Sequence, residues 1–236
     1  IEVGTTLFAR YADQYGVPMV IAVNQLDHEK ANFDETLHQL KEYFGGSVMP
    51  FQYPVNAGIG FDSVIDLLQM KLLKFPTNGG KMVVEDIPAD QMDKAEEMHN
   101  ALIEAAAEND EALMDKFFEE GTLSEEEMIR GLKLGIANRG TFPVIRIAAK
   151  NDQGIDRLLD LIVKNCPAPN EAPATKATNG NEHQCNAAEP FVGFVFKTAI
   201  EQHLGEVAFI KIYDGEVNKA ADLLNTTTNT KERISQ

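Results

Sequence analysis

The residues best placed to do chemistry are Asn24, Gln25 and Asp27, which follow an apolar run over residues 17–23. Such a run is typical of a parallel strand covered on both faces, and open α/β sheets bind ligands at the carboxyl ends of their strands. A carboxylate held there accepts two parallel hydrogen bonds, from the N1–H and the exocyclic amine of guanine. Adenine lacks this pair of donors. The sequence therefore predicts a guanine-reading loop with Asp27 as its selective residue.

A second loop of the same kind follows residues 143–150, which read PVIRIAAK and predict another buried strand. It ends at Ala148, Ala149 and Lys150. The two strand-end loops are able to close around one purine. Taken alone, however, Ala148 and Ala149 are better explained as small packing residues.

The surrounding pattern predicts the elements that position these loops. Apolar stripes predict helices over residues 5–15, 33–44 and 155–163, and strand, loop and helix alternate as in a doubly wound fold. Between the two loops the chain differs: residues 48–55 predict an edge strand, residues 82–87 a further strand, and the stretch from residue 92 onward two or three helices. Ser124 and Glu127 form a capping-box pattern at the start of the last of them. Residues 168–188 predict a linker, and alternation from residue 191 predicts β-structure.

Charge is concentrated in one segment of the 236-residue chain. Residues 85–127 contain sixteen acidic and two basic side chains, so they carry −14 of the net charge of −16. A surface of this sign excludes direct binding to DNA or RNA. It suits either a basic protein patch or a solvated helical face that keeps the protein soluble.

The remaining composition predicts neither a membrane protein nor a metalloprotein. No apolar run approaches the roughly 20 residues needed to span a bilayer, and no signal peptide is visible. The two cysteines form no disulfide framework, and the five histidines show no metal-ligand spacing. These features predict a cytoplasmic protein without a metal site of its own.

The first loop resembles the Asn-Lys-x-Asp guanine motif of GTPases, with Gln25 in place of lysine. In that family a second loop reads Ser-Ala-Lys or Ser-Ala-Leu, which resembles residues 148–150. Longer segments resemble elongation factor G in the same order along the chain: NQLDHEKANFDETLHQLKEYFG, GFDSVIDLLQMK, the acidic residues 85–133, QGIDRLLDLIVKNCPAPNEAP and PFVGFVFKTAIEQHLGEVAFIKIYDGEV. The chain is identified as a divergent relative of that family of translational GTPases.

The resemblance implies an α/β fold with four parts. Residues 1–47 and 142–167 correspond to the C-terminal half of a phosphate-loop GTPase domain with a parallel sheet, and residues 48–141 to an inserted α+β subdomain. Residues 168–188 are the linker, and residues 189–236 begin a β-barrel domain. The sequence contains no Gly-x-x-x-x-Gly-Lys-Ser/Thr loop. We therefore expect the chain to be a piece of a longer protein, without catalytic residues and unable to hydrolyse GTP by itself.

The resemblance also implies roles for the loop residues. GTP or GDP is the expected ligand, with Mg²⁺ bound only when the phosphate-binding part is present. Asp27 would read the base edge, and Gln25 would cover one face of the base. Asn24 would hold the loop and bond N7 of the base. The backbone N–H of Ala149 would bond guanine O6. Ala148 replaces a serine whose hydroxyl braces the aspartate loop in the family, and Lys150 completes the second loop.

The implied function is ribosome-dependent GTP hydrolysis coupled to translocation or ribosome recycling. Two alternatives stay open: a ribosome-protection type of translational GTPase, and a ribosome-binding paralogue that no longer hydrolyses GTP. The family's insertion subdomain faces the ribosomal stalk protein L7/L12. Glu97, Glu104 and Glu108 share one face of a predicted helix and are the expected contacts with it.

Overall fold

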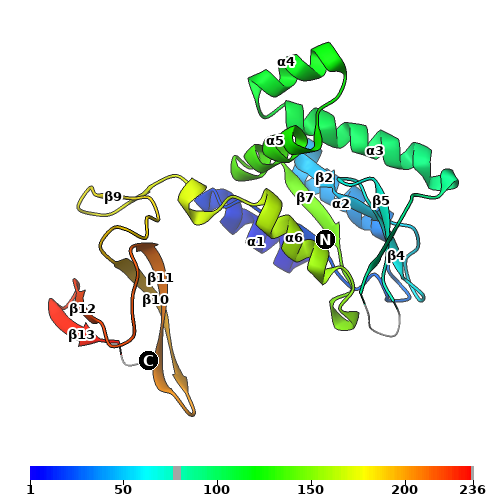
Figure 1. Cartoon of the computed structure of the whole chain (residues 1–236). Helices are drawn as coiled ribbons and strands as arrows, with labels where there is room; N and C mark the ends of the chain where they lie inside the picture. Colours follow the sequence, from blue (N-terminus) through cyan, green and yellow to red (C-terminus); the bar gives the residue numbers. More distant parts are fainter. Residues whose placement is uncertain (77–80, 235–236) are drawn as a thin grey trace. The chain divides into compact units, whose positions relative to one another are not determined.

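The computed structural model describes residues 1–76 and 81–234. The chain forms two compact units, Ile1–Pro167 and Ala168–Gln236, and each is described by itself. The first unit contains a parallel sheet, an antiparallel sheet and six α-helices within its described residues (Figure 1). This arrangement confirms the predicted α/β fold class.

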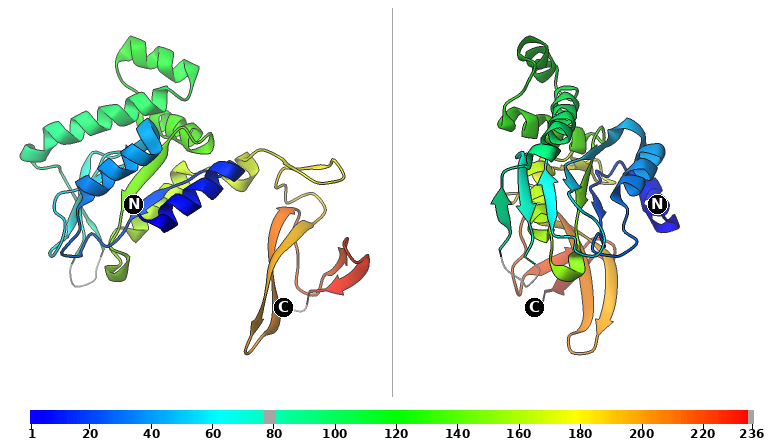
Figure 2. Two further views of the ribbon diagram at one scale, coloured as in Figure 1. Left: turned by 180° about the vertical axis from the view of Figure 1, so that it is seen from behind. Right: turned by 90° about the vertical axis from the view of Figure 1, so that its right-hand side faces the viewer.

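The parallel sheet is the layer that carries the two predicted loops. Its strand order is β1 (Ile21–Val23), β7 (Phe142–Arg146) and β2 (Val48–Pro50), so the last strand in sequence lies in the middle. All five residues of β7 are buried. Helices α2 (Phe33–Phe44) and α6 (Ile155–Asn165) lie on opposite sides of this sheet in the right-hand view of Figure 2.

The expectation that residues 17–23 form a strand buried on both faces is wrong. Only Ile21–Val23 is strand, Ile21 and Val23 are half-buried and Ala22 is exposed, and Val17 is 50% exposed. The physical reason is the position of β1. Within residues 1–76 and 81–234, β1 pairs with β7 alone, so it lies at the edge of the sheet and lacks the cover of a second neighbour.

Residues 48–55 form two strands in two different sheets, not the single edge strand predicted. After β2 the chain passes through Phe51 and enters β3 (Gln52–Pro54). The Phe51 N–H donates to the Val144 carbonyl in β7 at 2.9 Å, and the Phe51 carbonyl accepts from the Leu67 N–H at 3.0 Å. This one buried residue therefore joins the parallel sheet to the antiparallel sheet.

The antiparallel sheet has the order β3, β4 (Ser63–Asp66), β5 (Lys71–Lys74) and β6 (Val83–Glu85). β6 confirms the strand predicted over residues 82–87. All four residues of β4 are buried, because β4 lies between β3 and β5 and packs into the main core. The insertion predicted from residue 48 therefore begins with a strand of the parallel sheet and turns antiparallel only from Gln52.

Three helices follow β6: α3 (Ala89–Ala107), α4 (Glu111–Glu120) and α5 (Glu125–Ala137) (Figure 1). Helices α3 and α5 approach closely at Gly131. A Cβ at this position would overlap the Ala106 carbonyl oxygen, so the helices meet backbone to backbone here. A side chain at residue 131 would force them apart.

The start of α5 confirms the predicted capping box. The Ser124 Oγ accepts from the Glu127 N–H at 3.3 Å, and a Glu127 carboxylate oxygen accepts from the Ser124 N–H at 2.9 Å. The Lys116 ammonium of α4 donates to the same carboxylate at 2.8 Å. Lys116 and the Ser124 donors together lower the pKa of Glu127 to about 2. The capping box thus also joins α4 to α5.

The helix predicted over residues 5–15 is α1 (Val3–Tyr15), which ends at Gly16 with φ of 63°. A left-handed residue at this place is the usual reason for glycine after a helix. Among the helices of the described residues, none has the length and apolar character required to cross a lipid bilayer.

The second unit is built from β-hairpins. Strands β10 (Val192–Glu201) and β11 (Gly205–Asp214) form the longest, and β12 (Asp222–Asn225) pairs with β13 (Thr230–Arg233). This confirms a β-rich segment after the α/β part. Residues 168–188, predicted as a linker, include the short hairpin of β8 (Thr175–Lys176) and β9 (Glu182–His183).

A buried carboxylate fixes this short hairpin to the end of β11. Asp214 accepts from the Asn186 N–H at 2.8 Å, and its other oxygen lies 2.7 Å from Nδ1 of His183. The backbone donor of Asn186 and the His183 ring lower the pKa of Asp214. The carboxylate therefore stays charged while it holds the two segments together.

Candidate base-binding site

The two predicted loops emerge side by side because their strands are parallel neighbours. Val23 of β1 pairs with Arg146 of β7, and the Ile147 N–H donates to the Val23 carbonyl at 3.0 Å. Both chains then leave the sheet at its carboxyl edge, the usual ligand side of such sheets. The fold thus brings together the six residues proposed for the nucleotide: Asn24, Gln25, Asp27, Ala148, Ala149 and Lys150.

Asn24 joins the two loops. Its Oδ1 accepts from the N–H of Gln25 at 2.8 Å and from the N–H of Ala149 at 3.0 Å, across 125 positions of sequence. One amide oxygen therefore fixes the turn of the first loop and anchors the second loop to it. The Ala149 N–H, expected to bond guanine O6, is engaged with Asn24 here.

Asp27 lies in the first loop and is partly exposed. Its Oδ2 accepts from Nδ2 of Asn151 at 2.9 Å. In the described parts of the chain, Oδ1 of Asp27 has no hydrogen-bond partner. The carboxylate is thus held on one side and keeps an oxygen for a further donor.

The backbone of the first loop presents Gln25 outward. Gln25 has φ of 62°, a left-handed conformation that non-glycine residues adopt uncommonly. Its carbonyl accepts from the His28 N–H at 3.0 Å, which closes the turn. Leu26 is 1% exposed and its carbonyl accepts from the Gly58 N–H at 2.8 Å. The buried Leu26 and its bond to Gly58 therefore hold the loop, while the side chain of Gln25 stays exposed.

The second loop is closed on itself. The Ala148 N–H donates to the Gln153 carbonyl at 3.0 Å, and the Gln153 N–H donates back to the Ala148 carbonyl at 3.2 Å. Ala148 is fully buried, whereas Ala149 and Lys150 are exposed. Gly154 ends the loop because a Cβ there would lie 2.7 Å from the Arg146 carbonyl oxygen.

Arg146, two residues before Ala148, is an unusual residue for the centre of a sheet. It is fully buried and its guanidinium carbon lies 4.7 Å from the centre of the Phe33 ring, a cation–π contact. None of its guanidinium nitrogens has a hydrogen-bond partner within the described residues. Burial lowers the pKa of this guanidinium well below its ordinary value.

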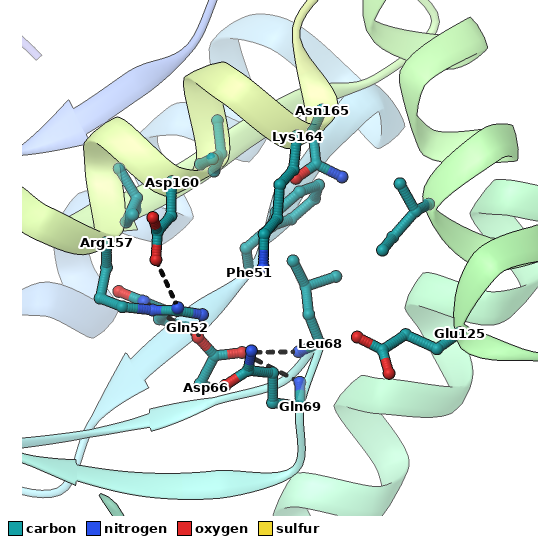
Figure 3. Close-up of a pocket in the computed structure, with 13 residues that line it drawn as sticks. Phe51, Gln52, Asp66, Leu68, Gln69, Glu125, Arg157, Asp160, Lys164 and Asn165 are labelled. Carbon is teal, nitrogen blue, oxygen red and sulfur yellow. Dashed lines mark hydrogen bonds and ion pairs between the residues drawn. The ribbon is translucent and has the colours of Figure 1, made fainter. Parts of the chain in front are cut away.

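A cavity elsewhere in the first unit is too small for a nucleotide. It has a volume of about 30 Å³ and lies between the β4–β5 turn, α5 and α6 (Figure 3). That volume holds about one or two water molecules. An ion pair between Asp66 and Arg157 lines it, with Nη2 and Oδ2 2.5 Å apart. This cavity is therefore not a site for a nucleotide.

Two features of the sheet edge bear on its chemistry. The edge offers one carboxylate with an unused oxygen and a backbone turn that exposes an amide side chain. Sequence reasoning missed Asn151, which holds Asp27. The available signal was an amide residue directly after the second loop, on an edge already predicted to carry the first loop.

Comparison with known proteins agrees with this architecture. A crystal structure of a protein from Thermus thermophilus superposes with a TM-score of 0.82 and 22% sequence identity. The match covers 99% of this chain and 33% of the other, so the chain spans about a third of that protein's length. At this identity the likeness shows the fold alone.

A match to a family model covers the whole first unit. Residues 1–168 match the model described as the elongation factor Tu GTP binding domain, which is more than half of the chain. The matched range contains both strand-end loops and the residues that join them. This chain therefore belongs to the family of the elongation factor Tu GTP binding domain.

Proposed function

We propose that this chain is part of a translational GTPase of the elongation factor G kind. The whole protein would bind GTP and GDP, act on the ribosome in the cytoplasm, and couple the nucleotide cycle to translocation or ribosome recycling. The observation that carries the proposal is the joined pair of loops, in which Asn24 bonds Ala149 and Asp27 presents its carboxylate beside them. Family membership supports the guanine nucleotide as ligand.

In this proposal each loop residue has one task. Asp27 accepts from the base edge, Gln25 covers one face of the base, and Asn24 holds both loops. We assign the Ala149 N–H to guanine O6. Since this N–H already donates to Asn24, the two acceptors would share it. Ala148 and Lys150 complete the second loop, Ala148 by filling space and Lys150 at its exposed end.

The proposed domain plan places residues 1–47 and 142–167 in the GTPase domain, residues 48–141 in an insertion, residues 168–188 in a linker and residues 189–236 at the start of a barrel. The antiparallel sheet and the three acidic helices support an insertion. The pairing of β2 with β7 supports a structural start of that insertion at Gln52.

Nucleotide binding by the full-length protein tests the base site. We expect GDP to bind about 10⁴-fold more tightly than ADP, because adenine leaves the Asp27 carboxylate without its paired donors. Titration with fluorescent GDP and ADP measures the two dissociation constants. Equal affinities for the two nucleotides would contradict the proposal.

Turnover separates the alternatives. An elongation-factor-G-like enzyme hydrolyses GTP faster when ribosomes are added, whereas a ribosome-binding paralogue without hydrolysis shows no turnover with or without them. A ribosome-protection type would hydrolyse GTP and also release a ribosome-bound drug. The 236 residues by themselves contain no phosphate-binding loop motif, so we propose that they bind the base but do not hydrolyse GTP.

The acidic helix α3 supports a further part of the proposal, contact with the L7/L12 stalk. Glu97 and Glu104 of α3, and Glu108 directly after its last residue, are exposed on one side. Ala95, Leu102 and Ala106 on the opposite face of α3 are buried. Charge complementarity of this kind speeds encounter more than it tightens a final complex.

Replacing Glu97, Glu104 and Glu108 with lysine is expected to slow association of the full-length protein with ribosomes by about tenfold at low salt, and to flatten its salt dependence. Stopped-flow mixing at two salt concentrations measures both effects. The matched control replaces three exposed glutamates of the second unit with lysine, which changes the net charge by the same amount. These are Glu201, Glu206 and Glu216. Equal slowing in both variants would show that only net charge matters.

A further inference from the structure

The base-reading carboxylate needs a fixed orientation. A carboxylate that accepts two parallel hydrogen bonds has to keep its plane aligned with the base edge. Binding groups work best when neighbouring hydrogen bonds hold them within about 0.5 Å and 10–20° of the productive geometry. Asp27 is partly exposed, so packing alone does not fix its side chain.

Asn151 supplies such a hydrogen bond from the opposite loop. Its side-chain Nδ2 donates to Oδ2 of Asp27 at 2.9 Å, across 124 positions of sequence. The donor is a neutral amide, so it orients the carboxylate without cancelling its charge. The bond uses one lone pair of Oδ2, so Oδ1 and the second lone pair of Oδ2 remain for the two donors of the base.

Asn151 is itself held in place by its turn. It ends the short 3₁₀ turn Ala149–Asn151, and its backbone N–H donates to the Ala148 carbonyl at 3.0 Å. The next residue, Asp152, has φ of 56° and its N–H donates to the Ala149 carbonyl. The start of this turn is anchored to Asn24. The amide of Asn151 therefore extends from a backbone that is fixed at both ends.

Two bonds thus cross between the loops, one from Ala149 to Asn24 and one from Asn151 to Asp27. The first holds the backbones together, and the second reaches the side chain that would meet the base. We propose that Asn151 is a positioning residue that fixes the plane of the Asp27 carboxylate and thereby sets discrimination between guanine and purines without the exocyclic amine. This inference rests on the proposed function.

The test compares GDP with inosine diphosphate, which retains the N1–H but lacks the 2-amine. In the full-length protein, Asn151→Ala is expected to reduce the preference for GDP over inosine diphosphate about tenfold, the effect of losing one hydrogen bond to a charged group. A merely structural loss would weaken both nucleotides equally and leave the ratio unchanged. The control is Asn218→Ala, an exposed asparagine of the second unit outside both loops.

A second variant replaces the amide donor of residue 151 with a group that repels the Asp27 carboxylate. Asn151→Asp keeps the side-chain size but places a second carboxylate beside Asp27, and like charges at this distance favour a shared proton. Binding of GDP is therefore expected to be weak at pH 8 and to recover at pH 5, where the shared proton restores a donor to Asp27. Asn151→Ala has no such group and should show no comparable recovery.

The outcomes separate this inference from the proposed function. An unchanged ratio in Asn151→Ala, in a protein that still prefers GDP to ADP, would overturn the positioning role alone. GDP binding by Asn151→Asp that stays as weak at pH 5 as at pH 8 would also overturn the positioning role. No preference for GDP over ADP in the unsubstituted protein would overturn the proposed function and this inference with it.

Discussion

Asp27→Asn is expected to shift the base preference of the full-length protein from guanine to xanthine by about 10⁴-fold. Asparagine presents an N–H₂ donor where the carboxylate accepts, and xanthine carries a carbonyl where guanine carries its amine. The structure supports this orientation of the new amide. Because Asn151 donates to the side chain of residue 27, it would hold the carbonyl oxygen of the new asparagine and turn its N–H₂ group toward the base.

The measurement is a competition between GTP and xanthosine triphosphate for the unsubstituted and substituted proteins. Asp93→Asn is the matched control, because Asp93 is an exposed aspartate of α3 outside both loops. A variant that keeps its full preference for GTP would show that Asp27 does not read the base.

The second large effect concerns stability. Asp66 is 1% exposed and carries two kinds of contact: its Oδ2 pairs with Arg157 of α6 at 2.5 Å, and its Oδ1 accepts from the N–H groups of Leu68 and Gln69, each at 3.0 Å. Loss of Asp66 leaves Arg157 with only its exposed partner Asp160 and leaves two turn N–H groups without their acceptor. Removing one partner of a buried pair costs about 3–5 kcal/mol. We expect Asp66→Ala to lower the stability of the first unit by about this amount.

Thermal unfolding of the full chain measures the effect, with an expected fall in midpoint of about 10 °C. Asp66→Asn separates the two contacts, since it removes the charge but keeps an acceptor for the turn, and should cost less than Asp66→Ala. Asp160→Ala is the control: this carboxylate also pairs with Arg157, but its side chain is 52% exposed, so its loss should cost about 1 kcal/mol or less. Equal effects at Asp66 and Asp160 would show that burial does not decide the strength of this pair.

The ion pair links the fold to the site. Arg157 lies in the first turn of α6, and α6 begins directly after the loop that ends at Gly154. Asp66 lies at the end of β4 in the antiparallel sheet. The pair therefore fixes the antiparallel sheet against the helix that follows the second base loop (Figure 3).

Much of the fold followed from local signals. The capping box at Ser124 depends on residues three positions apart, and the stop of α1 at Gly16 depends on one backbone conformation. Apolar stripes predicted α2 and α6, and the run over residues 143–150 predicted β7. These signals act within about one helical turn or one strand, so the sequence contains them directly. The types of the base-loop residues, and the order strand, loop and helix, were likewise readable from the chain.

Other features were decided by the tertiary structure alone. They depend on contacts between residues that are distant in sequence. The sequence did not predict that β7 lies between β1 and β2, which leaves β1 half-exposed at the edge, nor that Phe51 transfers the chain between two sheets. It also did not predict the bond of Asn151 to Asp27 or that of Arg157 to Asp66, over 124 and 91 positions. Such contacts arise only once strand order and register place two loops or layers together, and no local periodicity encodes that order. The sequence by itself thus determined which side chains stand in the two strand-end loops, and the packing of the sheets decided how those side chains are held.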